Sequence, residues 1–326
     1  MNYRKLGNTD LDVSTICLGT MTWGQQNTQE EGCEQMDYAL DQGINFFDTA
    51  EVYSIPPKKE TYGKTEEIIG NWFKKKKNRS KVILATKIAG PGVSWIRGGG
   101  NQYDKEKLNE AVNQSLKRLQ TDYIDLYQLH NHDSEISIEY TIERLLRLKE
   151  QGKIRYIGIS NFDVNQTKEV AKYTDIQSVQ PLYNMLHRVN GNDLLPFCAE
   201  NGIGVMAYSP LGKGLLTGHY KAGHKFDPED IRSKDLINVW QGDNFDNIYK
   251  VTEKLRNWAE DHGRDIIQLA IAWVLANKSV TTVIVGARKP NQVYHNIKAL
   301  DWKLTKNDLN EIEEILDGFI LPQDRW

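Results

Sequence analysis

Four side chains capable of proton chemistry lie at the ends of three short apolar runs in the sequence. Asp48 ends the first run and Tyr53 follows five residues later, while Lys87 ends the second run and His130 the third. A phenol has an ordinary pKa of about 10, and a cation beside it lowers that pKa by favouring the ionised form. Lys87 could act in this way on Tyr53, with Asp48 holding the ammonium group. The set suits reduction of a carbonyl, in which Tyr53 donates the proton and His130 orients the oxygen.

Each of these residues also has an ordinary structural explanation when it is considered alone. A strand-end aspartate can cap the next helix, a buried lysine can simply pair with it, and a single histidine is more often part of the core. Titratable groups gathered in one place are more typical of functional sites. Three strand ends and a phenol together therefore favour catalysis.

The apolar runs are too short for helices and lack a helical period, so they are expected to form buried strands. Eight strands are predicted, at 15–18, 44–48, 82–86, 124–129, 154–160, 178–181, 204–208 and 280–285. Helices are predicted at 28–42, 62–75, 104–119, 137–151, 163–172, 193–201, 245–262, 265–277, 290–299 and 305–316. Asp104 and Thr305 have the residue types that begin helices, and the stretch 209–244 is expected to be a long loop.

Alternating strands and helices predict either an open doubly wound sheet or a closed barrel. The glycine pattern GxGxxG of dinucleotide-binding open sheets does not follow the first strand. Eight units in roughly 250 residues match a (β/α)8 TIM barrel. We therefore expect one α/β barrel domain over residues 1–326, with an N-terminal β-hairpin within 1–14 and extra C-terminal helices. Active sites of such barrels lie at the C-terminal ends of the strands, where Asp48, Lys87 and His130 fall.

Composition narrows the function further. The chain has 326 residues, a net charge of −3 and 39% hydrophobic residues, a near-neutral balance that argues against a nucleic-acid surface. The only dense basic run, 74–77, is expected to be a solvated helix end. No stretch approaches the roughly 20 apolar residues of a membrane span, and the N-terminus lacks the apolar core of a signal peptide. Three scattered cysteines indicate reduced thiols in a cytoplasmic protein. The sequence is compatible with either a monomer or a homo-oligomer.

Several spaced motifs together resemble the aldo-keto reductase superfamily, and the likeness runs from the hairpin to Leu316. The motifs are DTAEVY (48–53), TK (86–87), DYIDLYQLH (122–130), IGISNF (157–162) and YSPL (208–211). The resemblance implies that Asp48, Tyr53, Lys87 and His130 form the catalytic tetrad of this family. It also implies reduction of aldehydes and ketones with NADPH, or sometimes NADH, and without a metal.

The same resemblance implies a set of cofactor contacts. Ser160, Asn161 and Gln180 would bind the nicotinamide carboxamide, and Tyr208 would stack on the nicotinamide ring. The pyrophosphate would lie against Ser209, Leu211, Lys213, Gly214 and Leu215. The adenosine end would lie along 286–296, including Gly286, Arg288, Gln292 and Asn296. Arg288 suits a 2′-phosphate through charge-assisted hydrogen bonds, and a helix starting at Pro290 would add a favourable dipole.

Departures from the family pattern leave two properties open. Many members carry a basic residue at the position of Gln292 and a lysine at that of Gly286, so NADPH and NADH both stay open as cofactors. The prolines Pro56 and Pro57 follow Tyr53 in an insertion that resembles one bacterial branch of the family. This insertion would reshape the substrate mouth. Candidate substrate walls, besides Tyr53 and His130 themselves, are Trp23, Trp95 and the loop 211–244, with Trp23 the first choice.

Two other functions compete with this interpretation. In a metal-dependent barrel hydrolase, His130 and His132 would share one face of a strand, but a zinc site needs three or more protein ligands. The second alternative is a non-catalytic or weakly catalytic NADPH-sensing subunit, because the β subunits of voltage-gated potassium channels resemble this family. Retention of all four tetrad residues favours turnover over sensing alone.

Overall fold

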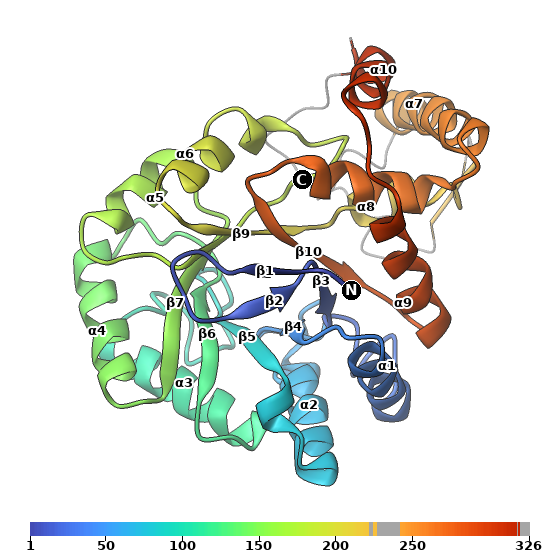
Figure 1. Cartoon of the computed structure of the whole chain (residues 1–326). Coiled ribbons are helices and arrows are strands. Elements are labelled where there is room, and N and C mark those ends of the chain that lie inside the picture. The colour runs from blue at the N-terminus through green and yellow to red at the C-terminus, as the bar shows by residue number, and fades with distance from the viewer. Residues whose placement is uncertain (222–223, 227–241, 318, 320–326) are drawn as a thin grey trace.

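The chain, described by a computed structural model, forms a closed barrel of eight parallel strands (Figure 1). The structure describes residues 1–221, 224–226, 242–317 and 319. The strands of the barrel are β3 (Ile16–Gly19), β4 (Phe46–Asp48), β5 (Ile83–Ile88), β6 (Ile124–Leu129), β7 (Ile154–Ser160), β8 (Ser178–Gln180), β9 (Gly204–Tyr208) and β10 (Val280–Gly286). Each pairs with the next in the sequence, and β10 pairs with β3 to close the ring. The predicted (β/α)8 barrel is confirmed.

Helices surround the barrel, and several of them begin at a residue whose side chain accepts one of the first backbone N–H groups. They are α1 (Gln29–Asp41), α2 (Lys64–Lys76), α3 (Lys105–Leu119), α4 (Ile138–Glu150), α5 (Val164–Ala171), α6 (Leu194–Glu200), α7 (Gly242–Asp261), α8 (Ile266–Ala276), α9 (Pro290–Ile297) and α10 (Lys306–Leu316). The Asp104 side chain accepts the N–H of Lys107, and Thr305 forms a reciprocal capping pair with Asp308. Both predicted helix starts are therefore confirmed. None of the described helices is long and apolar enough to cross a membrane.

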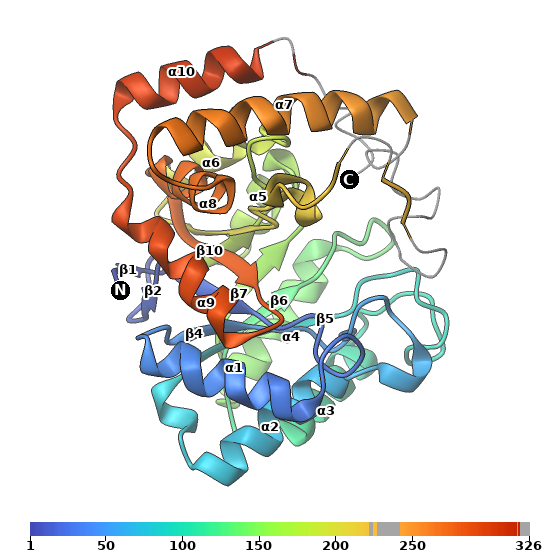
Figure 2. The same cartoon turned by 90° about the vertical axis from the view of Figure 1, so that its right-hand side faces the viewer.

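The region after β9 departs from the prediction of a continuous loop over 209–244. A 3₁₀ helix occupies Gly212–Thr217, and α7 already begins at Gly242. Residues 222–223 and 227–241 of the predicted loop lie outside the described residues. The helices α7 and α10 pack against each other beside the barrel, as both views show (Figures 1 and 2). They are the extra C-terminal helices expected from the sequence.

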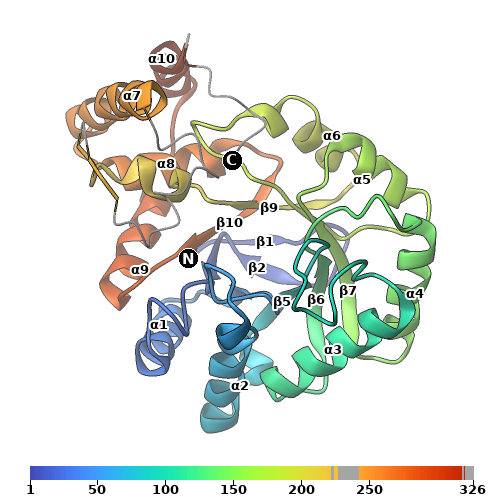
Figure 3. The ribbon, with the colours of Figure 1, turned by 180° about the vertical axis from the view of Figure 1, so that it is seen from behind.

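A hairpin of β1 (Tyr3–Lys5) and β2 (Asp12–Ser14) closes the end of the barrel at which the strands begin (Figure 2). Leu6, Leu11 and Val13 of this segment pack into the barrel against Cys17 and other strand residues. The long loops gather at the opposite end, which Figure 3 shows from behind. Because the hairpin covers the end where the strands begin, the C-terminal ends of the strands form the open end of the barrel.

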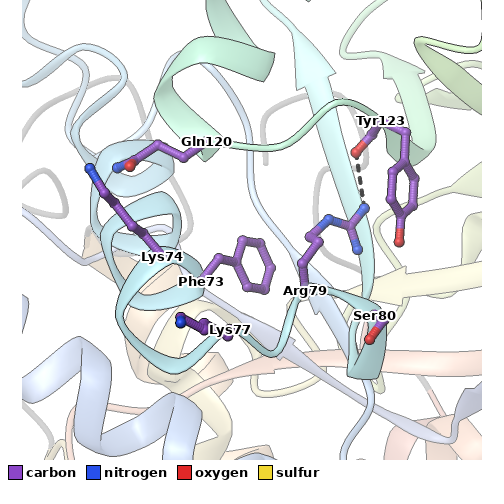
Figure 4. Close-up of a pocket in the computed structure, with 7 residues that line it drawn as sticks. All are labelled: Phe73, Lys74, Lys77, Arg79, Ser80, Gln120 and Tyr123. Atoms are coloured by element: carbon purple, nitrogen blue, oxygen red, sulfur yellow. Dashed lines mark hydrogen bonds between the residues drawn. The ribbon is translucent and has the colours of Figure 1, made fainter.

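The basic run at the end of α2 lies beside a hollow of about 590 Å³ near the start of β5 (Figure 4). Arg79 at this hollow donates to Asp125 at 2.7 Å and lies 4.1 Å from the centre of the Tyr123 ring. Lys76 of the run pairs with Asp37 at 2.8 Å. The guanidinium charge of Arg79 is already matched by a carboxylate, so this hollow offers little chemistry.

Candidate active site

The centre of the site is a buried ion pair between neighbouring strands. Asp48 is the last residue of β4, and Lys87 lies within β5, one residue before its end. The Lys87 ammonium donates to Asp48 Oδ2 at 2.7 Å and to the carbonyl oxygen of Thr49 at 2.8 Å. Both side chains are shielded from solvent, with exposures of 0% and 4%. The strand β5 extends further than predicted, so Lys87 is held by the sheet instead of by a loop.

Glutamine side chains complete the surroundings of Asp48. Its Oδ1 accepts hydrogen bonds from Gln180 Nε2 at 2.8 Å and Gln128 Nε2 at 3.4 Å. The hydroxyl of Thr20 donates to the Asp48 carbonyl at 2.8 Å. Gln128 was not identified from the sequence, although a polar residue two positions before His130 on a buried strand shares its face.

Tyr53 lies over this ion pair and beside His130. The Lys87 Nζ is 5.1 Å from the centre of the Tyr53 ring, and the His130 ring meets that ring edge-on at 5.9 Å. Burial raises the pKa of Tyr53 above 10.0, Lys87 offsets part of the rise, and Asp48 adds to it. Lys87 thus acts in the predicted direction, but the predicted net lowering is wrong in this structure because loss of solvent outweighs the cation. A raised pKa keeps Tyr53 protonated at neutral pH.

The protonation states of the other two titratable groups also follow from burial. Burial lowers the pKa of Lys87, but Asp48 and Tyr53 together outweigh this effect and leave the pKa raised. Burial, helped by the charge of Lys87, lowers the pKa of His130 to about 3. At neutral pH the site therefore holds an ammonium group, a neutral phenol and a neutral imidazole. A neutral imidazole can still donate one hydrogen bond to an oxygen atom.

These groups line one end of a cavity of about 690 Å³ at the C-terminal ends of the strands. Several residues expected at a cofactor site line it too: Ser160, Asn161, Gln180, Tyr208, Ser209, Leu211, Lys213, Gly286, Arg288, Gln292 and Asn296. Gly214 and Leu215 do not line the cavity, and neither does Lys87, which contacts Asp48 and Tyr53. The cavity also contacts residues that the sequence did not indicate: Thr20, Met21, Thr22 and Ile267.

The polar residues at the ends of β7, β8 and β9 hold one another in place. Ser160 Oγ donates to the Gln180 carbonyl at 3.0 Å, and the Tyr208 hydroxyl donates to Asn161 Oδ1 at 2.7 Å. The Asn161 amide in turn donates to the His130 carbonyl at 2.9 Å. Such a network fixes the orientation of the amides and of the Tyr208 ring on the cavity wall.

The opposite wall of the cavity carries cationic groups and a helix N-terminus. Lys213 lies on the 3₁₀ helix after β9, and burial lowers the pKa of its ammonium group. Arg288 precedes α9, whose first residue is Pro290, and its Nη2 donates to Gln26 Oε1 at 2.7 Å. Cations and a helix N-terminus suit phosphate groups, while Tyr208 and the amides suit an aromatic amide. The donor set therefore fits a nicotinamide dinucleotide.

The two tryptophans that were predicted to form substrate walls lie in different surroundings. Trp23 is fully buried, and its indole N–H donates to Gln35 at 3.3 Å, so the expectation that it forms a substrate wall is wrong. Trp95 is partly exposed and meets Tyr62 edge-on at 5.7 Å, in the loop that leads from β5 to α3, and it does not line the cavity either. Part of the third candidate wall, the loop 211–244, lies outside the described residues.

The positions of His130 and His132 bear on the alternative of a metal site. Within 1–221, 224–226 and 242–317, no three His, Cys, Asp or Glu side chains are placed to share a metal ion. The ring of His132 packs edge-on against Phe162 at 5.3 Å, whereas that of His130 packs against Tyr53. The two histidines thus have separate surroundings.

Comparison with known proteins gives a consistent result. Residues 15–317 match the family model described as "Aldo/keto reductase family". Protein tas of Escherichia coli is 35% identical, over 99% of this chain and 99% of that protein. Among solved structures, the glycerol dehydrogenase AKR11B4 from Gluconobacter oxydans has a TM-score of 0.83 and 30% identity, covering 97% of this chain and 95% of that one. The holo form of aldo-keto reductase AKR11C1 from Bacillus halodurans has a TM-score of 0.81 and 32% identity, covering both chains completely.

A relative of another kind bears on the alternative function. A protein of Arabidopsis thaliana named as a probable voltage-gated potassium channel subunit beta is 32% identical, over 98% of this chain and 97% of that protein. Similarity at this level thus extends both to proteins named as enzymes and to one named as a channel subunit.

Proposed function

We propose that this chain, which belongs to the aldo/keto reductase family, reduces aldehyde or ketone carbonyls to alcohols with NADPH, and with NADH as the weaker cofactor. The observation that carries the proposal is the buried Lys87–Asp48 pair beneath the phenol of Tyr53. A cation confined beside a neutral phenol, with a neutral imidazole opposite, suits protonation of an oxygen that gains negative charge.

The roles of the side chains follow from their protonation states. Ser160, Asn161, Gln180 and Tyr208 would hold a reduced nicotinamide, which would supply the hydride for the carbonyl carbon. The neutral imidazole of His130 donates a hydrogen bond that orients the carbonyl oxygen. The Tyr53 hydroxyl gives its proton to that oxygen as negative charge develops there. Lys87 stabilises the phenolate that remains, and Asp48 keeps the ammonium group charged and in place.

A panel of carbonyl compounds tests this proposal directly. Short aldehydes, aromatic aldehydes, ketones and the two oxidation products of glycerol would be added in turn, and NADPH consumption followed by its absorbance. The glycerol products belong in the panel because a similar structure is that of a glycerol dehydrogenase. We expect carbonyl-dependent oxidation of NADPH and formation of the alcohol. Tight NADPH binding with no turnover of any compound would instead favour the sensing function suggested by the channel subunit.

The cofactor preference yields a prediction for Arg288. The side chain lies on the cavity wall near the start of α9, where it can pair with a 2′-phosphate. Loss of charge-assisted hydrogen bonds in Arg288→Ala should weaken NADPH binding roughly tenfold to hundredfold. NADH lacks this phosphate, so its affinity should change less than about threefold. Dissociation constants for both cofactors, measured by quenching of protein fluorescence, provide the check.

The neighbouring cation Lys289 is a matched control for this measurement. It is exposed, carries the same charge and does not line the cavity. Lys289→Ala should leave the ratio of NADPH to NADH affinity close to that of the wild type. An unchanged ratio in Arg288→Ala, or an equal change in both variants, would count against a specific role of Arg288.

The depressed pKa of His130 predicts the shape of the acidic side of the pH profile. An imidazole with a pKa of about 3 stays neutral throughout the range from pH 5 to pH 8. The rate constant for reduction, kcat, should therefore show no step near the ordinary imidazole pKa of about 6.5. Single-turnover rates with saturating NADPH measure this profile, and a fall below pH 6.5 that disappears in His130→Gln would contradict the neutral assignment.

A further inference from the structure

A second buried ion pair includes a residue close in sequence to Tyr53, the proposed proton donor. Glu51 is two residues before Tyr53 and is completely buried. Its Oε1 accepts hydrogen bonds from Arg97 Nη2 and the Ala89 amide, both at 2.6 Å. Its Oε2 accepts from Arg97 Nη1 and the Tyr62 hydroxyl, both at 2.7 Å. The guanidinium of Arg97 therefore binds the carboxylate of Glu51 through two parallel hydrogen bonds. This bidentate geometry fixes the relative orientation of the two groups as well as their distance.

Arg97 belongs to the loop that leads from β5 to α3 and that also carries Trp95. Its backbone has φ of 45°, a left-handed conformation that non-glycine residues rarely adopt without support. Its side chain is only 5% exposed, although the loop lies at the open end of the barrel. Burial lowers the pKa of Arg97, but its bonds to Glu51 outweigh this effect, so the side chain stays charged. The pair with Glu51 thus holds the loop against the body of the protein.

The two segments joined by this pair share a small apolar cluster. Ala50 and Val52 come from the Tyr53 segment, and Ala89 and Ile96 from the Arg97 loop. The side chains of Tyr53, Tyr62, Val93 and Trp95 pack against this cluster and are partly buried. Two of the four buried residues of this cluster, Ala89 and Ile96, therefore come from the loop that Arg97 joins to Glu51.

From this arrangement we propose that the Glu51–Arg97 pair is a positioning device that sets the phenol of Tyr53 relative to the carbonyl substrate. The inference rests on the proposed reductase function. Neither residue lines the cavity, so both act through the side chains they hold. Loosening the pair moves the phenol relative to the reacting oxygen, which lowers the rate without touching the cofactor contacts.

The primary test is Arg97→Met, with Arg97→Lys as the conservative variant. Small displacements of reacting groups lower rates steeply, so kcat should fall roughly tenfold to hundredfold in Arg97→Met. NADPH affinity should stay within about twofold of the wild type. Arg97→Lys keeps the charge but loses the paired geometry, so its kcat should be intermediate. A wild-type kcat in Arg97→Met would overturn the inference.

The alkaline side of the pH profile separates positioning from general loss of stability. Burial is the main cause of the raised pKa of Tyr53. Because the Arg97 loop covers part of the cluster beneath Tyr53, its release admits water and should move the alkaline fall in kcat to lower pH. Arg79→Met is the matched control: it breaks another shielded arginine–carboxylate pair, with Asp125, at the other end of the barrel. Its pH profile should match the wild type, and equal effects in both variants would overturn the inference.

A double variant and a proteolysis assay separate loss of loop docking from loss of folding. The double variant Glu51→Gln/Arg97→Met removes both charges, so no charge is left buried alone, and it should fold even if Arg97→Met does not. Chymotrypsin cleavage after Trp95, measured without substrate, should be faster in these variants than in the wild type. If the wild type reduces no carbonyl, the proposed function fails by itself, and cleavage then decides whether the pair docks the loop. Cleavage at the wild-type rate in the folded variants would overturn the inference.

Discussion

Replacing Tyr53 with phenylalanine should remove most of the reductase activity and leave cofactor binding intact. The hydroxyl is the proposed proton donor, and a positioned general acid contributes about 10²–10⁴-fold to a rate. The ring would keep its edge-on packing against His130 and its place over Lys87. We therefore expect kcat in Tyr53→Phe to fall by about 10³-fold, with the dissociation constant of NADPH unchanged within about twofold. Single-turnover reduction and cofactor titration measure the two quantities.

Tyr103 offers a matched control for the loss of a phenolic hydroxyl. Its side chain is buried, and its hydroxyl donates to the Asn131 carbonyl at 2.6 Å outside the cavity lining. Tyr103→Phe should therefore keep the wild-type rate. A Tyr53→Phe variant that reduces carbonyls at the wild-type rate would refute Tyr53 as the proton donor.

The fall in the wild-type reduction rate at alkaline pH also reports on the protonation of Tyr53. A general acid works only while it is protonated, so the rate falls as the pH rises through its pKa. Burial raises the pKa of Tyr53 above 10.0. The charge balance around a phenol can be read from neighbouring residues, but its desolvation depends on the packed loops that cover it. This is why sequence reasoning expected a net lowering.

The gathering of Asp48, Lys87 and His130 was predictable because it needs only local information. Each lies at the end of a short apolar run, and the order of strands in a closed barrel follows the order in the chain. The register of β4, β5 and β6 then brings these ends side by side. Even so, β5 runs on past the predicted end, a difference of the kind expected at element boundaries.

Contacts between distant loops were not predictable from the same patterns. Glu51 and Arg97 are 46 positions apart, and no period or cap relates them. Trp23 was the first choice among the candidate substrate walls. The indole instead fits against Gly32 of α1, where a Cβ atom would lie 3.2 Å from the ring. The missing side chain of Gly32 provides this room, and only the packing of α1 on the barrel reveals it.

Replacing Lys87 with methionine should lower both the stability and the activity of the protein, for separable reasons. The substitution leaves the Asp48 carboxylate buried without its cation, and breaking a buried pair in this way costs about 3–5 kcal/mol. We expect the free energy of unfolding in urea to fall by that amount. The matched control is Lys76→Met, since Lys76 pairs with Asp37 at 2.8 Å on the surface with 42% and 40% exposure. Loss of that exposed pair should cost less than about 1 kcal/mol.

The pH dependence of stability has a definite sign for this pair. The pKa of folded Lys87 is raised above its ordinary value of 10.5. The stabilisation by its ammonium group is therefore fully present below about pH 10.5 and is lost as the pH rises through the folded pKa. The stability difference between the wild type and Lys87→Met should be constant from pH 7 to pH 10 and shrink above it. A difference that already shrinks between pH 7 and pH 9 would contradict this assignment.

The double variant Asp48→Asn/Lys87→Met separates folding from catalysis. Removing both charges leaves no buried ion alone, so most of the lost stability should return. The activity should not return, because the phenolate of Tyr53 then has no cation beside it, and kcat should remain about a hundredfold or more below the wild type. Recovery of both stability and rate would show that the ion pair supports only the barrel. If stability returns and the rate does not, Lys87 takes part in proton transfer in addition to stabilising the barrel.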